Sequence, residues 1–251
     1  MLLLTRLSFM QQIQKAATSG YVYYTTGACP AIKLPGLVKK FEKAYQVNQT
    51  RQQVYRKKQK GDASAKLFIY AHPTDKTAFF WVLMVTQGQH LAHALEDLDD
   101  LRGRKTRLTY GDYQLIQKPS SAGKPSFTWS LTTDAYHYYA SLIRKTLRSH
   151  HSGAANDLLK HLSVMPGFSG VRQQRKDLQK VWQGEAKRHF KTLEDRKIQN
   201  AYTRQQKVEQ VIYLDGFVNK MLENDLTVTQ QIKKHRENLR KRTPSSIRKD
   251  A

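Results

Sequence analysis

The segment GQHLAHALEDLDDLRGRK, residues 88–105, combines residue types that bind metal ions. His90 and His93 are followed by Glu96, and on a helix these three positions share one face. Imidazole and carboxylate groups are zinc ligands, and paired carboxylates hold Mg²⁺ for phosphodiester cleavage. Catalytic zinc helices place their histidines at i and i+4, which this segment does not. One hypothesis is therefore a metal-dependent nuclease that uses His90, His93 and Glu96 with a further ligand from elsewhere.

The same residues also fit a surface helix without chemistry. Leu91, Leu95 and Leu98 form an apolar face, and four acids within residues 96–100 lie opposite it. We favour this structural interpretation of helix 90–101, and its acidic side offers a docking surface for a protein partner. The chain has no phosphate-binding glycine loop, nucleophile elbow or dinucleotide fingerprint. We predict no catalytic residue, no metal ligand and no cofactor, so an enzyme is the less favoured reading.

Basic side chains gather in the segment LPGLVKKFEKAYQVNQTRQQVYRKKQKG, residues 34–61. Its pattern predicts a helix over 34–45, a short turn, and a second helix over 50–60 rich in Arg and Gln. Two such helices resemble a helix-turn-helix, whose second helix contacts DNA. Val54, with Tyr55 as a second candidate, is expected to face the core. The predicted nucleic-acid-binding residues of this helix are Arg51, Gln52, Arg56, Lys57, Lys58 and Lys60.

A second basic stripe is predicted on a helix from Ser169 to Phe190. Steps of four, four and seven residues place its cations along one side, away from the apolar positions Val171, Leu178 and Trp182. Such a stripe can contact successive phosphates, although a solvated lysine face has the same pattern. The predicted binding residues here are Arg172, Lys176, Lys180 and Lys187.

The whole chain is strongly cationic, with 43 Lys and Arg against 20 Asp and Glu and a net charge of +23. Residues 1–60 contain one acid, while residues 61–131 are almost neutral. A neutral scaffold with basic flanks favours a polyanionic partner. We predict binding to nucleic acid, to DNA rather than RNA, mainly through phosphate contacts, and no membrane partner. The single cysteine, Cys29, excludes an internal disulfide and agrees with a cytoplasmic location.

The neutral middle contains the predicted strands. They are short, aromatic or β-branched, and separated by turn residues. They cover residues 65–71, 78–85, 107–110, 113–117 and 127–132, with an additional strand over 21–26. This order predicts an α+β protein with an antiparallel sheet of about five strands. With the N-terminal helices, the elements match either a winged helix or a ferredoxin-like βαββαβ order.

The C-terminal half is expected to be helical. Helices are predicted from Thr133 to about His150, over a short segment that ends at Pro166, over 169–190, and over a segment containing Val208, Val211 and Leu222. The expected organisation is an α+β domain over 1–132, a helical region over 133–225, and a basic, partly disordered tail over 226–251. The acid-free first 20 residues could also act as a targeting segment.

Three segments carry a resemblance to other proteins. YYTTGACP, FFWVLMVTQGQH and PGFSGVRQQ resemble parts of uncharacterised proteins from bacterial plasmids and integrating conjugative elements. The resemblance covers about residues 20–190. It implies a bacterial mobile element and carries no activity and no site residue.

Overall fold

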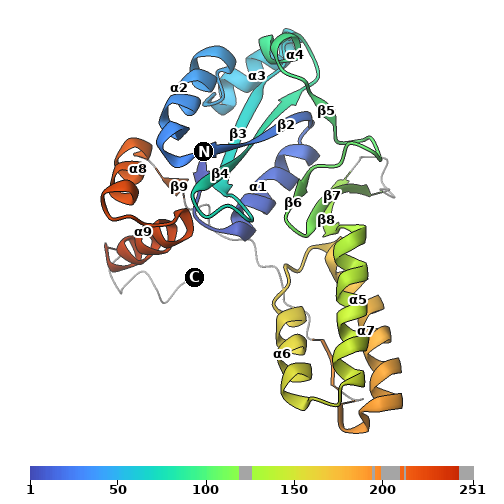
Figure 1. Cartoon of the computed structure of the whole chain (residues 1–251). Helices are drawn as coiled ribbons and strands as arrows, with labels where there is room; N and C mark the ends of the chain where they lie inside the picture. Colours follow the sequence, from blue (N-terminus) through green and yellow to red (C-terminus); the bar gives the residue numbers. More distant parts are fainter. Residues whose placement is uncertain (119–125, 194–195, 199–209, 212, 243–251) are drawn as a thin grey trace. The chain divides into compact units, whose positions relative to one another are not determined.

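The computed structural model describes residues 1–118, 126–193, 196–198, 210–211 and 213–242 (Figure 1). The chain divides into two compact units. The first unit joins Met1–Asp100 to Gln206–Ala251, and the second unit comprises Leu101–Gln205. The first unit is therefore discontinuous in sequence, a division that differs from the predicted positions after residues 132 and 225. The predicted α+β class is confirmed.

The first unit is built on a mixed sheet with strand order β5-β2-β4-β3-β1-β9. Its strands are β1 (Leu2–Leu3), β2 (Tyr21–Pro30), β3 (Ala65–Ala71), β4 (Ala78–Thr86), β5 (Asp99–Asp100) and β9 (Gln210–Val211). Strand β1 runs parallel to β3, and the other pairs are antiparallel. Its helices are α1 (Arg6–Thr18), α2 (Leu34–Tyr45), α3 (Arg51–Gln59), α4 (Leu91–Leu95), α8 (Leu214–Glu223) and α9 (Val228–Arg242), and a 3₁₀ turn, η1 (Ala31–Lys33), precedes α2.

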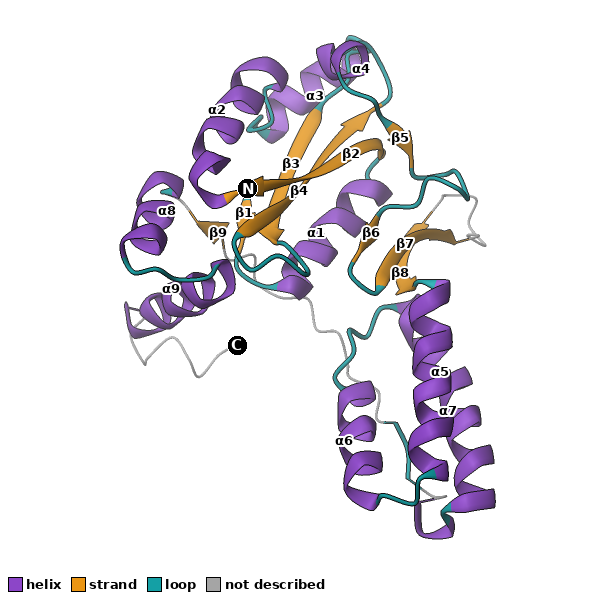
Figure 2. Cartoon of the chain, in the orientation of Figure 1, coloured by secondary structure: helices purple, strands orange, loops and turns teal. Residues whose placement is uncertain are grey.

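Strands β3 and β4 are apolar along most of their length because helices cover both faces of the sheet (Figure 2). On one face, Phe9 of α1 stacks on Tyr70 with ring centroids 5.7 Å apart and meets Phe80 edge-on. On the other face, Phe41 of α2 packs edge-on against Trp81 at 5.2 Å. The unit is thus a three-layer arrangement with the sheet in the middle.

The core beneath α2 is completed by the last described part of the chain. Phe217 and Met221 of α8 and Val228 and Ile232 of α9 are buried in the same hydrophobic cluster as Phe41. The segment predicted as a basic, partly disordered tail over 226–251 contains the packed helix α9, whose apolar residues fill this core. Residues 243–251 lie outside the described residues.

The second unit combines a three-stranded antiparallel sheet, β6-β7-β8, with helices. Gly170 lets the first turn of α7 lie against β8, since a Cβ there would stand 2.5 Å from the Trp129 carbonyl oxygen. Trp182 is buried and donates from Nε1 to the Leu193 carbonyl at 3.2 Å. The elements are β6 (Thr109–Tyr110), β7 (Tyr113–Lys118), β8 (Ser126–Leu131), α5 (Thr133–Arg148), α6 (Ser152–Ser163), α7 (Ser169–His189) and the 3₁₀ turn η2 (Lys191–Leu193).

The strands form two sheets rather than the single antiparallel sheet that was predicted. The elements from α1 to β4 follow the predicted winged-helix order in the chain. The winged-helix architecture is nevertheless absent, because β4 is a buried strand rather than a solvated wing, and α1 and α2 cover opposite faces of the sheet. The ferredoxin-like order is wrong because residues 107–117 contribute to the sheet of the second unit.

Two predicted helices also need correction. The helix over 90–101 ends at Leu95, and Glu96 has extended backbone angles, after which Asp99 and Asp100 pair with β2. The helix predicted to contain Val208, Val211 and Leu222 begins only at Leu214, since Val211 pairs with Leu2 in β9. Val208 lies outside the described residues.

Candidate nucleic-acid interface

Helix α3 begins with a capping box that fixes its first turn. The Gln53 backbone N–H donates to Thr50 Oγ1 at 3.3 Å, and the Thr50 N–H donates to Gln53 Oε1 at 2.8 Å. Before it, α2 ends at Tyr45, and the next residue, Gln46, has a φ of 51° that reverses the chain without the glycine usual at that position. The two helices are therefore joined by a turn held by polar side chains.

No residue of α3 is buried, so the helix lies outside the core. Val54 is half-buried as expected, but Tyr55 is 63 % exposed and does not face the core. A helix that contributes so little to packing is free to present its side chains to a ligand. Of the predicted residues, Lys57 is half-buried, and the others are exposed: Arg51, Gln52, Arg56, Lys58 and Lys60.

The cations of this helix make no ion pair and no side-chain hydrogen bond within the described part of the chain. They follow one another within ten residues without an intervening acid. Like charges at this density repel each other, and a bound polyanion relieves that repulsion. We call the residues Arg51, Gln52, Arg56, Lys57, Lys58 and Lys60 the α3 patch.

Lys15 and Lys66 extend the positive charge beyond α3. The ammonium of Lys66 in β3 lies 4.5 Å from the ring centroid of Tyr21. Burial lowers the pKa of Lys66, and the positive charges of Lys15 in α1 and Arg51 lower it further. Within the described residues, these three cations have no acidic partner. Three elements of the first unit thus bring unneutralised positive charge to one place.

The stripe on α7 is exposed as predicted, but its charges are partly neutralised. Lys180 pairs with Asp177 at 3.5 Å, and Arg172 donates to the Gly167 carbonyl. Lys176 and Lys187 are exposed on the same helix. The stripe belongs to the second unit and the α3 patch to the first, so each is a separate candidate surface. The α3 patch is the stronger candidate because its cations make no ion pair with any described residue, whereas Lys180 of the stripe does.

The three residues proposed as metal ligands each form a hydrogen bond with another part of the first unit. His90 Nδ1 accepts from the Ala92 N–H at 3.1 Å and caps α4, and His93 Nε2 donates to the Thr86 carbonyl at 2.9 Å. The Glu96 carboxylate accepts a hydrogen bond from the Tyr45 hydroxyl. Burial and this carboxylate raise the pKa of Tyr45 to about 12. Across the described ranges, no three His, Cys, Asp or Glu side chains are grouped so as to hold a metal ion. The helical spacing behind the nuclease hypothesis is wrong.

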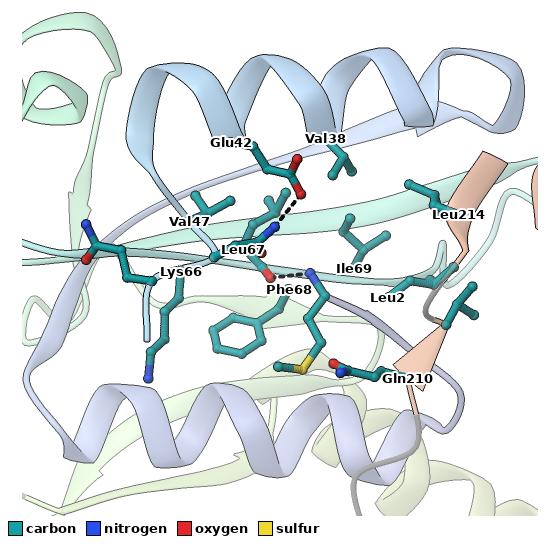
Figure 3. A pocket seen from close by; sticks show the side chains of 14 residues that line it. Leu2, Val38, Glu42, Val47, Lys66, Leu67, Phe68, Ile69, Gln210 and Leu214 are labelled. Atoms are coloured by element: carbon teal, nitrogen blue, oxygen red, sulfur yellow. Dashed lines mark hydrogen bonds between the residues drawn. The ribbon is translucent and has the colours of Figure 1, made fainter. Parts of the chain in front are cut away.

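A pocket of about 470 Å³ lies at the edge of β3, where β1 covers the strand only near Ile69 (Figure 3). Leu67 and Ile69 face the α2 side of this edge, and Lys66 and Phe68 face the α1 side. Glu42 of α2 accepts a hydrogen bond from the amide of Asn48, which also lines the pocket. The pocket therefore has apolar walls, side-chain amides, the Glu42 carboxylate, and two cationic groups, the Lys66 ammonium and the N-terminal ammonium of Met1.

Sequence reasoning found the α3 patch but missed Lys15, Lys66 and the exposure of Tyr55. Lys66 is the single charge in the apolar strand AKLFIYA, which was the available signal. Its proximity to Lys15 and Arg51 depends on how α1, α3 and β3 pack together. The spacing of these residues in the sequence therefore does not predict it.

Helices of the described ranges are too short or too polar to span a lipid bilayer. Comparisons of the chain with models of protein families, with curated proteins and with solved structures return no match.

Proposed function

We propose that the protein binds nucleic acid, DNA in preference to RNA, through phosphate contacts from the α3 patch. The observation that carries the proposal is that no cation of this patch makes an ion pair with another described residue, on a helix without a buried residue. Each Lys or Arg that neutralises a phosphate releases condensed counterions, which makes such binding favourable and dependent on salt. The α7 stripe is a second, weaker phosphate-binding surface. The setting on a bacterial mobile element remains a prediction from the resemblance.

The proposal is tested by replacing Arg56 and Lys58 together with Gln, which keeps the helix propensity close to that of the wild type. The affinity for labelled DNA is measured by fluorescence anisotropy over a series of salt concentrations. We expect weaker binding at low salt. The slope of log affinity against log salt concentration should be smaller in magnitude by about two, since roughly one counterion is released per lost contact.

A matched control removes two charges from α9 of the same unit, Lys233→Gln with Lys234→Gln, at exposed positions. This control should keep the wild-type slope, whereas a loss equal to that of the α3 variant would show that only net charge matters. Unchanged binding in the α3 variant, with an unchanged circular dichroism spectrum, would remove α3 from the proposal. Running duplex DNA, single-stranded DNA and RNA in parallel tests the preference for DNA.

A further inference from the structure

Tyr55 stands among the cations of α3 with its ring in solvent. It lies four residues after Arg51 and three before Lys58, and these spacings place the three side chains on neighbouring positions of one helix face. Its side chain is 63 % exposed, which leaves the ring open to contact. An aromatic ring between phosphate-binding cations is the arrangement on which unpaired bases stack.

The pocket at the edge of β3 has the size and lining of a small-molecule site. Its volume, about 470 Å³, lies in the range of pockets that hold ligands of nucleotide size. On the α2 side, Val38 and Val47 provide apolar walls, Asn48 and Gln49 provide amides, and Glu42 provides a carboxylate that keeps a phosphate away from this side. The Oε1 atom of Gln49 is buried and has no hydrogen-bond partner among the described residues, so a ligand donor that reached it would satisfy this acceptor.

Two cationic groups line this pocket, and the N-terminal ammonium of Met1 is engaged by the Leu67 carbonyl at 3.0 Å. Lys66 is half-buried in β3 and points toward α1, on the opposite side of the strand from Glu42 (Figure 3). Lys15 and Arg51 lie close enough to act on its charge. A duplex keeps its bases stacked inside, so it cannot deliver a base to a pocket without extrusion, whereas a single strand bends and unstacks freely.

We propose that the nucleic acid held at the α3 patch is single-stranded, with bases stacked on Tyr55 and one nucleotide entering the pocket at the β3 edge. A phosphate of this strand lies on the α1 side of β3, at Lys66, Lys15 and Arg51. The nucleic acid crosses the edge of β3, so that its nucleoside contacts Val38, Val47 and the Gln49 amide on the α2 side. This inference rests on the proposed function and adds to it the class of the ligand.

The test measures affinities for a thymidine oligonucleotide and for a duplex of the same length. Four variants are compared with the wild type: Tyr55→Ala, Tyr55→Phe, Lys66→Gln and Val38→Trp, the last filling the pocket. The single strand should bind more tightly than the duplex. Tyr55→Ala should weaken single-strand binding by about tenfold, and Tyr55→Phe should restore it because the ring is kept.

The pocket variants have their own expected signatures. Lys66→Gln should flatten the single-strand salt dependence by about 0.7 units, the value for one lost contact. Val38→Trp should weaken single-strand binding and leave duplex binding unchanged. Tyr55 lies outside the core, so the Tyr55 variants stay informative even if Lys66→Gln or Val38→Trp lowers the melting temperature.

The outcomes separate the two proposals. The single-strand inference is overturned if the wild type binds both ligands with equal affinity and Tyr55→Ala does not change that affinity. The proposed function stands in that case if the Arg56 and Lys58 variant still binds DNA more weakly. Tight duplex binding with weak single-strand binding also overturns the single-strand inference and keeps the proposed function. If neither oligonucleotide binds at low salt, the proposed function itself fails.

Discussion

Glu185 is a buried carboxylate held by cations in the second unit. Its side chain is 6 % exposed and accepts from Arg148 Nε at 2.9 Å and Nη2 at 3.3 Å, and Arg188 lies 3.6 Å away. The hydrogen bonds from Arg148 hold the pKa of Glu185 below its usual value of 4.5, against the effect of burial. Folding therefore favours the ionised carboxylate, which ties the end of α5 to α7.

The depressed pKa of Glu185 gives a pH-dependent prediction. Its contribution to stability is complete above the unfolded value and is lost as pH falls through the folded pKa. Glu185→Gln should therefore lower the melting temperature at neutral pH, and the difference from wild type should shrink as the pH falls below about 4.5. Thermal unfolding followed by circular dichroism over a pH series measures both. A difference that stays constant with pH would contradict this account.

The matched control for this prediction is Asp157→Asn. Asp157 pairs with Lys160 on the surface of α6, and both side chains are 79 % exposed. Exposed pairs contribute little because solvent screens them. The control should melt like the wild type at every pH.

Among the elements, α9 is the one whose role differs most from the sequence-based expectation. Its cations suggested a solvated tail, yet Ile232 is 5 % exposed, and Gln231 Nε2 donates to the Phe217 carbonyl at 3.1 Å. The Val228 N–H also donates to the Lys76 carbonyl, which fixes the helix to the β3–β4 turn. The helix is thus part of the first unit's core and does not act only through charge.

Replacing Ile232 with Ala tests that role. Removing a buried Ile side chain costs about 2 kcal/mol or more of the free energy of unfolding, because a cavity remains. The neighbouring Lys233→Ala, at an exposed position, should change it by less than about 0.5 kcal/mol. Urea unfolding measures both, and equal stabilities would mean that α9 does not seal the core.

The elements differ in how far the sequence predicts them. Strand β3 has the predicted bounds, and β4 differs by one residue, because each is an apolar run between turn residues. The two-residue strands β1, β5 and β9 are too short to show a period. Strands β1 and β5 pair with the edges of the longer strands β3 and β2, and β9 pairs in turn with β1. Helix α4 is shorter than predicted because Glu96 leaves the helix and bonds to Tyr45, a contact 51 residues distant in sequence.

The same limit applies to the candidate site. The cations of α3 were predictable because they follow one another on a single capped helix. Lys15 and Lys66 were not, since their common role depends on how α1, α3 and β3 pack. Tyr55 was misjudged because its spacing fits an inward-facing position, while α3 as a whole lies outside the core.

At the scale of the whole molecule, the second unit is inserted into the first. The first unit's chain leaves at β5 and returns at β9, which are the two opposite edges of its sheet. Five strand spacings of about 4.8 Å separate these edges, or roughly 24 Å. Any connection between Asp100 and Gln210 must span that distance.

This geometry predicts how the insertion can be removed. Replacing residues 101–209 with a Gly/Ser linker of about 20 residues should give a folded first unit, because its mean reach matches the span. A linker of about four residues is too short even when fully extended and should give an unfolded or aggregated chain. Circular dichroism and analytical size exclusion compare the two, and equal behaviour would contradict the strand order.

Because α8 and α9 complete the core of the first unit, this unit cannot finish folding until the end of translation. The α3 cations are synthesised early, but the apolar face of α2 stays exposed until residues 214–232 have been synthesised and pack against it. A nascent chain halted within the second unit therefore carries the exposed α3 cations on a first unit whose core is not yet closed. We expect proteases to remove such incomplete chains, so only translation through α9 yields a stable first unit.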